Sequence, residues 1–279
     1  GGREPVDAIV GGAHSAINAP VTSLAAVCKI PQVSFGATSP GLSNKDSYPM
    51  FLRTIPPDSL QGFAMWRFVE FFLVPSLACA FTVEPYGEGL FSALIDKSVS
   101  VGQGFRVIGV GVRYMPGAGK YDMQEAWTKV GLIKRHKVNF AFLAMTPDQA
   151  VGLLQVMSDA GMLGGAMHIV GSEALEYTPQ LSRLPVGYMY LKPASRGPLW
   201  RRFADMYSRM TVDDLLPGAD PDRHGLSSLG IPIDQWRVAA LRDPDDLPMY
   251  APFVFDAAYS VMLSVSELMK EGVPLRSIR

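Results

Sequence analysis

The sequence predicts an α/β fold in which mainly parallel sheets are flanked by helices. Short apolar runs alternate along the chain with longer helical segments, which is typical of parallel strands joined by crossover helices. The apolar runs are continuous, as expected for strands covered on both faces. With 279 residues, 48% of them hydrophobic and 18% charged, the chain can form a substantial ordered core.

The expected elements follow in order. Strands are predicted at 7–10, 32–36, 77–82, 106–112, 139–144, 167–171 and 186–191. Helices are predicted at 15–28, 58–72, 86–97, 121–135, 147–160, 197–209 and 251–270. Polar residues, Gly and Pro mark 39–49 as a loop and 210–248 as a long surface insertion.

Charge and cysteine content exclude several classes of protein. The 25 basic and 26 acidic residues give a net charge of −1, which argues against a nucleic-acid partner. Two cysteines, Cys28 and Cys79, are too few for a disulfide scaffold or a four-thiolate zinc site. No apolar run reaches the roughly 20 residues that span a bilayer. The start lacks both a signal peptide and an initiator Met, so we expect an excerpt or a processed product.

Enzyme signatures are incomplete. Gly102–Gly104 and Gly109–Gly111 lack the third glycine and the following helix of a dinucleotide site. Gly117–Lys120 resembles the end of a phosphate loop, but Tyr121 stands where Ser or Thr must bind magnesium. The four histidines show no metal-ligand spacing. We therefore expect no metal, no cofactor and no catalysis.

Two predicted strand ends are suited to ligand binding. The run Val10–Ala16 leads from a strand through small residues into a helix, whose first N–H groups favour an anion. The run Gln32–Pro40 is an apolar strand that ends in small polar residues, where parallel sheets bind ligands. Ordinary capped turns would explain both runs as well.

These segments, taken in order, resemble the ligand-binding domain of family C G-protein-coupled receptors, which include metabotropic glutamate and type-B GABA receptors. The matching runs are 30–43 (IPQVSFGATSPGLS), 48–59 (YPMFLRTIPPDS), 86–88 (YGE), 171–173 (GSE) and 251–259 (APFVFDAAY). The resemblance implies a two-lobed, type I periplasmic-binding-protein-like fold. Lobe one would hold residues 1–75, lobe two 76–192, and 193–279 would return to lobe one. Lobe one would be incomplete at its N-terminus.

The resemblance also implies a site for an amino acid. Ser15 and Thr38 stand where hydroxyls bind the ligand carboxylate, and Thr38 also reaches the ammonium. Asp58 and Glu173 match acids that face the ammonium, and Tyr86 matches a tyrosine whose ring covers it. Each of the last three also has a structural explanation: a helix N-cap for Asp58, a packed aromatic for Tyr86 and a capping acid for Glu173.

The resemblance implies three departures from the glutamate receptors. Glu173 stands where they have an aspartate, one methylene shorter with the same charge. Gly36 replaces a serine whose backbone contact could remain, and Tyr250 replaces the lysine that binds the glutamate side chain. The expected ligand is therefore an amino acid or an amino-acid-like molecule, without a preference for glutamate.

The implied function is an extracellular sensing domain on the cell membrane that signals by lobe closure. The helix 15–28 would form a homodimer or heterodimer through lobe one if Leu24 and Val27 make an exposed stripe, although both could face the core. An amino-acid transport binding protein, soluble or periplasmic, is the alternative. A receptor domain of the guanylyl cyclase type, binding peptides or nothing, is a third possibility.

Overall fold

The computed structural model describes residues 6–101, 105–115, 120–163, 167–176, 188–194, 196–198, 200–209 and 249–273. The chain divides into two compact units, one formed by 1–193 with 252–279 and the other by 194–251. In the smaller unit, helix α6 (Trp200–Arg209) carries an ion pair between Arg209 and Asp205 at 2.6 Å. The functional argument below concerns the larger unit.

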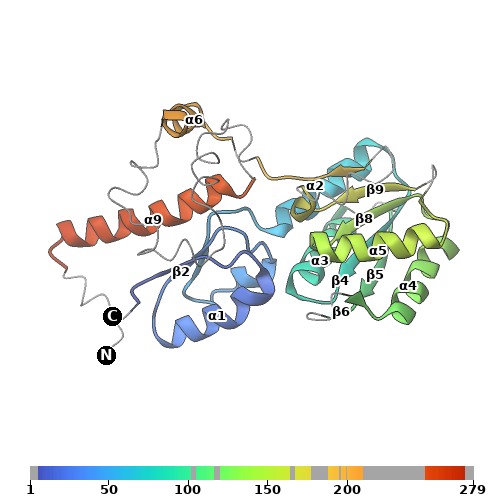
Figure 1. The fold of residues 1–279 in the computed structure, drawn as a ribbon, viewed down its shortest axis with the longest axis horizontal. Helices are drawn as coiled ribbons and strands as arrows, with labels where there is room; N and C mark the ends of the chain where they lie inside the picture. Colours follow the sequence, from blue (N-terminus) through green and yellow to red (C-terminus); the bar gives the residue numbers. More distant parts are fainter. Residues whose placement is uncertain are drawn as a thin grey trace, which may run out of the picture. The chain divides into compact units, whose positions relative to one another are not determined.

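A five-stranded parallel sheet is the main element of the larger unit (Figure 1). Its strand order is β10 (Met189–Tyr190), β9 (His168–Gly171), β8 (Phe140–Ala144), β4 (Ser76–Thr82) and β5 (Arg106–Val112). The connecting helices are α3 (Pro85–Val101), α4 (Met123–Arg135) and α5 (Pro147–Asp159). Because the chain enters the sheet at β4 and then adds β5 on one side and β8, β9 and β10 on the other, the sheet is doubly wound.

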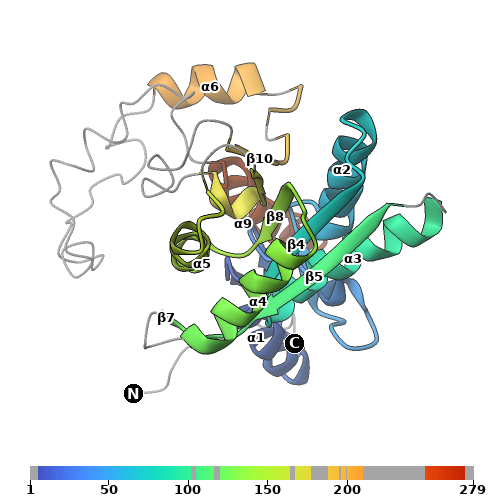
Figure 2. The same cartoon turned by 90° about the vertical axis from the view of Figure 1, so that its right-hand side faces the viewer.

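Both faces of this sheet are covered, and the residues of β4 alternate between them. Ala78 and Ala80 belong to a buried cluster with residues of α4 and α5, whereas Leu77 and Cys79 belong to a second cluster with residues of α3 and of α2 (Asp58–Phe71). Figure 2 shows α2 and α3 on one side of the sheet and α5 on the other. This burial on both sides explains why the strands are continuous apolar runs.

Close contact between α2 and α3 depends on a glycine. A Cβ atom on Gly62 would lie 2.8 Å from the backbone carbonyl carbon of Ala93 on α3. Real Cβ atoms do not approach backbone this closely, so a larger residue would push the helices apart. The helix that begins at Asp58 is therefore held against the five-stranded sheet.

A smaller parallel sheet has the order β1 (Ile9–Val10), β2 (Gln32–Ser34) and β3 (Phe51–Arg53). Helix α1 (Ser15–Val27) connects the first two strands, and the short helix η1 (Pro40–Ser43) lies within the segment that the sequence indicated as a loop. On α1, Leu24 and Val27 are 69% and 81% exposed. The interpretation that they face the core is therefore wrong.

The last helix, α9 (Ala251–Lys270), is anchored to the smaller sheet near its first turn. The Thr54 hydroxyl, just after β3, donates a hydrogen bond of 2.8 Å to the carbonyl of Phe253. Phe253 and Ala257 are buried. Residues 199 positions apart in the sequence thus meet through this contact.

The predicted fold class is confirmed, and the differences concern short elements. The sequence missed β3 and the antiparallel pair β6 (Tyr114–Met115) and β7 (Lys120–Tyr121). The predicted insertion at 210–248 and residues 186–187 of the last predicted strand lie outside the described residues. Within the described ranges, no helix has the length and apolar character needed to cross a membrane. The lobe boundaries stay a prediction.

Candidate ligand-binding site

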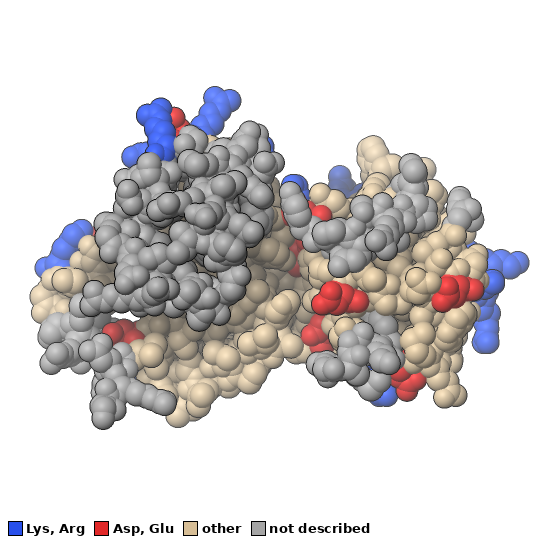
Figure 3. All heavy atoms as spheres, in the orientation of Figure 1, with Lys and Arg blue, Asp and Glu red and all other residues tan. Residues whose placement is uncertain are grey.

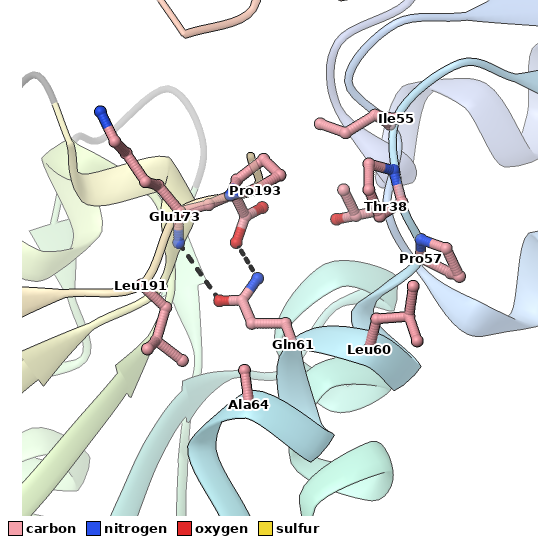
Figure 4. A pocket seen from close by; sticks show the side chains of 11 residues that line it. Thr38, Ile55, Pro57, Leu60, Gln61, Ala64, Glu173, Leu191 and Pro193 are labelled. Atoms are coloured by element: carbon pink, nitrogen blue, oxygen red, sulfur yellow. Dashed lines mark hydrogen bonds between the residues drawn. The ribbon is translucent and has the colours of Figure 1, made fainter. Parts of the chain in front are cut away.

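A cavity of about 170 Å³ lies beside the start of α2. Three segments form it: the turn after β2, the residues that lead into and begin α2, and the chain from η2 (Glu173–Leu175) past β10. Its described lining consists of Thr38, Ile55, Pro56, Pro57, Leu60, Gln61, Ala64, Glu173, Leu191, Lys192 and Pro193. In Figure 4, Thr38 and Glu173 stand on opposite sides, with Gln61 between them.

Asp58 is the first residue of α2 and is fully buried. The N-cap position is held by Pro57, and among the described residues no side chain caps this helix. The interpretation of Asp58 as the N-cap is therefore wrong. Its Oδ1 accepts a hydrogen bond of 3.4 Å from the Gln61 amide, while its Oδ2 has no hydrogen-bond partner in the described part of the chain.

Glu173 is the centre of the polar contacts in this region. Its Oε2 accepts hydrogen bonds from the Tyr86 hydroxyl, at 2.9 Å, and from the Gln61 Nε2. Its own backbone N–H donates to the Gln61 Oε1 at 3.2 Å. The dashed lines of Figure 4 mark the two contacts with Gln61. Glu173 is the first residue of η2, whose N-cap is Ser172. Among the described residues no side chain caps this short helix, so the interpretation of Glu173 as a capping acid is wrong.

Tyr86 also has two roles. Its ring is 7% exposed and belongs to the buried cluster of α2 and α3, as the packed-aromatic interpretation expects. Its hydroxyl nevertheless reaches Glu173. Because packing fixes the ring of Tyr86, it also fixes the position of the hydroxyl that donates to Glu173.

Two acids are thus buried close to each other. Burial raises the pKa of Glu173 to about 7, although hydrogen bonds from Tyr86 and the backbone oppose this shift. Burial, and then the charge of Glu173, raise the pKa of Asp58 well above its usual range. A hydrogen bond from the Thr38 side chain, and then the charge of Arg53, oppose this rise in the pKa of Asp58. The Arg53 guanidinium also donates to the carbonyls of Ala37 and Ser39, at 3.2 and 2.8 Å.

This arrangement favours a positively charged group. Ionised carboxylates that lie in a buried site without full pairing are costly, and a bound ammonium would reduce that cost by charge-assisted hydrogen bonds. The unpartnered Oδ2 of Asp58 and the Oε2 of Glu173 are acceptors of the required kind.

Ser15 begins α1 and Gly36 lies in the bend after β2. Neither residue is among the described residues that line the cavity, and the same holds for Asp58 and Tyr86. The buried Ser15 hydroxyl accepts from the Ser39 N–H at 3.1 Å. His14 rather than Ser15 is the N-cap of α1. The Gly36 N–H donates to the Ser34 hydroxyl at 3.3 Å, which caps the turn after β2.

Close packing at Gly36 restricts that position. A Cβ atom there would lie 2.9 Å from the backbone oxygen of Ala13. Tyr250 lies in a turn within the smaller unit, so its predicted role stays a prediction.

The structure therefore brings Thr38, Asp58, Tyr86 and Glu173 into one connected region. Gln61 connects it, and the sequence analysis did not identify this residue. The available signal was its place three residues after Asp58 on the same helix, where side chains face each other. In the described part of the chain, no group of three or more His, Cys, Asp or Glu side chains is arranged to hold a metal ion.

A parallel α/β fold with buried acids beside a cavity defines a ligand-binding protein. Residues 2–276 match the family described as receptor family ligand binding region, and the chain belongs to this family. The resemblance to the ligand-binding region of family C G-protein-coupled receptors is thus confirmed.

Two relatives show the same relationship. A metabotropic glutamate receptor-like protein E of Dictyostelium discoideum is 35% identical over 98 residues, which are 35% of this chain and 12% of that protein. Metabotropic glutamate receptor 4 of Macaca fascicularis is 30% identical over 119 residues, which are 43% of this chain and 13% of that protein. The matched segments therefore span a small part of each relative.

Proposed function

We propose that the chain is the extracellular ligand-sensing domain of a membrane receptor and binds an amino acid or an amino-acid-like molecule between two lobes. The observation that carries this proposal is the buried pair Asp58 and Glu173, joined by Gln61 beside a cavity. The names of the relatives, both metabotropic glutamate receptors or receptor-like, support a receptor on the cell membrane with this domain outside the cell.

The chemistry of the proposed ligand follows from the polar groups. The ligand ammonium binds to Glu173 and Asp58, under the ring of Tyr86. The carboxylate binds to the hydroxyls of Thr38 and Ser15 and to neighbouring N–H groups at the start of α1. These hydroxyls and carboxylates are suited to hold the two charged ends of a zwitterion, so the proposed role is binding.

Signalling follows from the position of these groups along the chain. Thr38 belongs to the predicted lobe one and Glu173 to the predicted lobe two. A ligand that contacts both binds the closed form more tightly and shifts the population towards it. The exposed Leu24 and Val27 on α1 are the proposed dimer contact of lobe one.

A thermal-shift screen of the standard amino acids and GABA tests the binding proposal. A ligand at 100 times its Kd stabilises the folded state by about 2.7 kcal/mol, which raises the Tm by several degrees. Glu173→Ala should abolish the shift, Glu173→Asp should keep part of it, and Glu88→Ala, at an exposed acid outside the cavity lining, should leave it unchanged. Equal shifts for all three variants would contradict the assigned role of Glu173.

The alternative is an amino-acid transport binding protein of the same fold. Such a protein would have the same cleft and would give the same result in the thermal-shift screen. Sequence that flanks this chain in the parent protein separates the two, since a receptor has membrane-spanning helices after the domain and a transport protein has a secretion signal before it.

A further inference from the structure

Most of the cavity beside Glu173 is apolar. Its polar groups are those of Thr38 and Glu173, on opposite sides, and of Gln61 between them (Figure 4), and Lys192 is the basic residue of the described lining. The remaining lining residues are apolar: Ile55, Pro56, Pro57, Leu60, Ala64, Leu191 and Pro193. In Figure 4, Leu60 and Ala64 extend from α2, with Leu191 on the facing segment.

We infer that the bound amino acid has an uncharged, apolar side chain, and that this side chain fills the apolar part of the cavity. The inference rests on the proposed function, because it takes the ammonium at Glu173 as the fixed end of the ligand. From that end, the neighbouring walls are the aliphatic side chains and the proline rings. Binding against such walls is favoured when apolar surface of the ligand leaves water. It is disfavoured when a charged group of the ligand loses its water.

Lys192 is the group that could favour an acidic side chain instead. Its ammonium lies 2.8 Å from the Oε1 of Glu176, whose side chain is 9% exposed. The charge of Lys192 is therefore balanced by a largely buried acid. A ligand carboxylate would have to compete with Glu176 and enter a mainly apolar space, so the geometry favours a neutral side chain.

A homologous series measures this directly. Alanine, 2-aminobutyrate, norvaline and norleucine share one head group and differ by single methylenes. Each added methylene that is buried should tighten the Kd by about fourfold until the cavity of about 170 Å³ is full. Calorimetry should also show glutamate and lysine binding at least tenfold more weakly than norvaline.

A substitution in the cavity lining tests where the side chain of the bound amino acid lies. Ala64 is an exposed residue of the lining, so Ala64→Leu fills space without disturbing the core. It should weaken norleucine binding at least tenfold and leave alanine binding unchanged. Ser59→Leu, on the same helix but outside the described lining, is the matched control and should alter neither.

The outcomes separate the two proposals. Glutamate binding more tightly than norvaline, and losing that advantage in Lys192→Met, would overturn the apolar inference and leave the amino-acid site in place. An equal Kd across the homologous series would also overturn it. Absence of binding by every amino acid tested would overturn the proposed function itself.

Discussion

Gln61 and Glu173 contact each other through both ends of one amide group. The Gln61 Nε2 donates to the Glu173 carboxylate, and the Gln61 Oε1 accepts from the Glu173 backbone N–H at 3.2 Å. The two residues are 112 positions apart in the sequence. One side chain on α2 therefore sets the position of an acid that begins η2.

Removal of this amide should destabilise the fold. Gln61→Met keeps the length of the side chain but removes one of the hydrogen bonds to the buried Glu173 carboxylate and the acceptor of the Glu173 N–H. Loss of the acceptor for a buried N–H costs about 1–3 kcal/mol. Urea unfolding measures the free energy of unfolding. Gln155→Met is the control, since Gln155 makes a comparable bond to Asp159 at 2.8 Å on an exposed helix face and its loss should change stability by less than about 0.5 kcal/mol.

The stability of the unliganded protein should fall as pH rises. Burial raises the pKa of Glu173 from 4.5 to about 7, so between these values the folded state binds more protons than the unfolded state. Stability from this group is complete below 4.5 and is lost as pH rises to about 7. Unfolding measured from pH 4.5 to 8 should show this decline in the wild type and a weaker one in Glu173→Gln. Parallel curves for the two proteins would contradict the assignment.

Ligand affinity should depend on pH in the opposite direction. An ammonium binds the ionised form of Glu173, and that form is populated above a pKa of about 7. The Kd for norvaline should therefore fall between pH 6 and pH 8. Below pH 7, calorimetry in two buffers of different ionisation enthalpy should detect proton release on binding. A Kd that stays constant across this range would place the ammonium away from Glu173.

Two glycine substitutions should change the free energy of unfolding in opposite directions. Gly62→Ala would force a Cβ atom against the backbone of Ala93, and overpacking of this kind costs about 1–3 kcal/mol. Gly131 lies within α4, and a Cβ there would meet no heavy atom of the described residues within 4 Å. Gly131→Ala should therefore stabilise the protein by about 0.5–1 kcal/mol. In urea unfolding, the midpoint of Gly62→Ala should lie below that of the wild type and the midpoint of Gly131→Ala above it.

The α1 surface tests the proposed dimer. Leu24 is 69% exposed, so Leu24→Asp should not disturb the core. If Leu24 and Val27 form a dimer contact, light scattering should show a lower mass for the variant than for the wild type at the same concentration. Ser23→Asp, whose exposed hydroxyl bonds within its own helix to Ala19, is the neighbouring control. Equal masses for wild type and Leu24→Asp would contradict the dimer.

The charged surface agrees with the composition. Figure 3 shows acidic side chains in several separate places on the described part of one face, with wide uncharged areas between them. A chain with 25 basic and 26 acidic residues is expected to present such a mixed surface. Charge alone therefore indicates no partner, and the proposals above depend on the buried acids.

The long apolar strands were predictable because each carries its signal locally. The predicted strand 106–112 agrees with β5 at both ends, and helix 251–270 agrees with α9. By contrast, β3 has three residues, Phe-Leu-Arg, which is too short for any period to show. The 3₁₀ helix at Pro40–Ser43 lies in a segment whose Gly and Pro content also suits a loop.

The site was less predictable than the fold. Residue type marks Asp58 equally well as a helix cap and as a ligand group, and only the cap position at Pro57 separates these roles. Gln61 carries no motif, because its main partner is distant in the sequence. Contacts of this kind arise from the packing of elements, so no local pattern can reveal them.

The close approach of Gly36 to the backbone of Ala13 limits how this site can be re-engineered. The resemblance implies a serine at this position in the glutamate receptors, and Gly36→Ser would supply its hydroxyl. Because the obstacle is main chain and not a side chain that can rotate away, the exchange also requires a different route for the loop that carries Ala13. Grafting a glutamate receptor's selectivity onto this scaffold would therefore mean transplanting the two loops together.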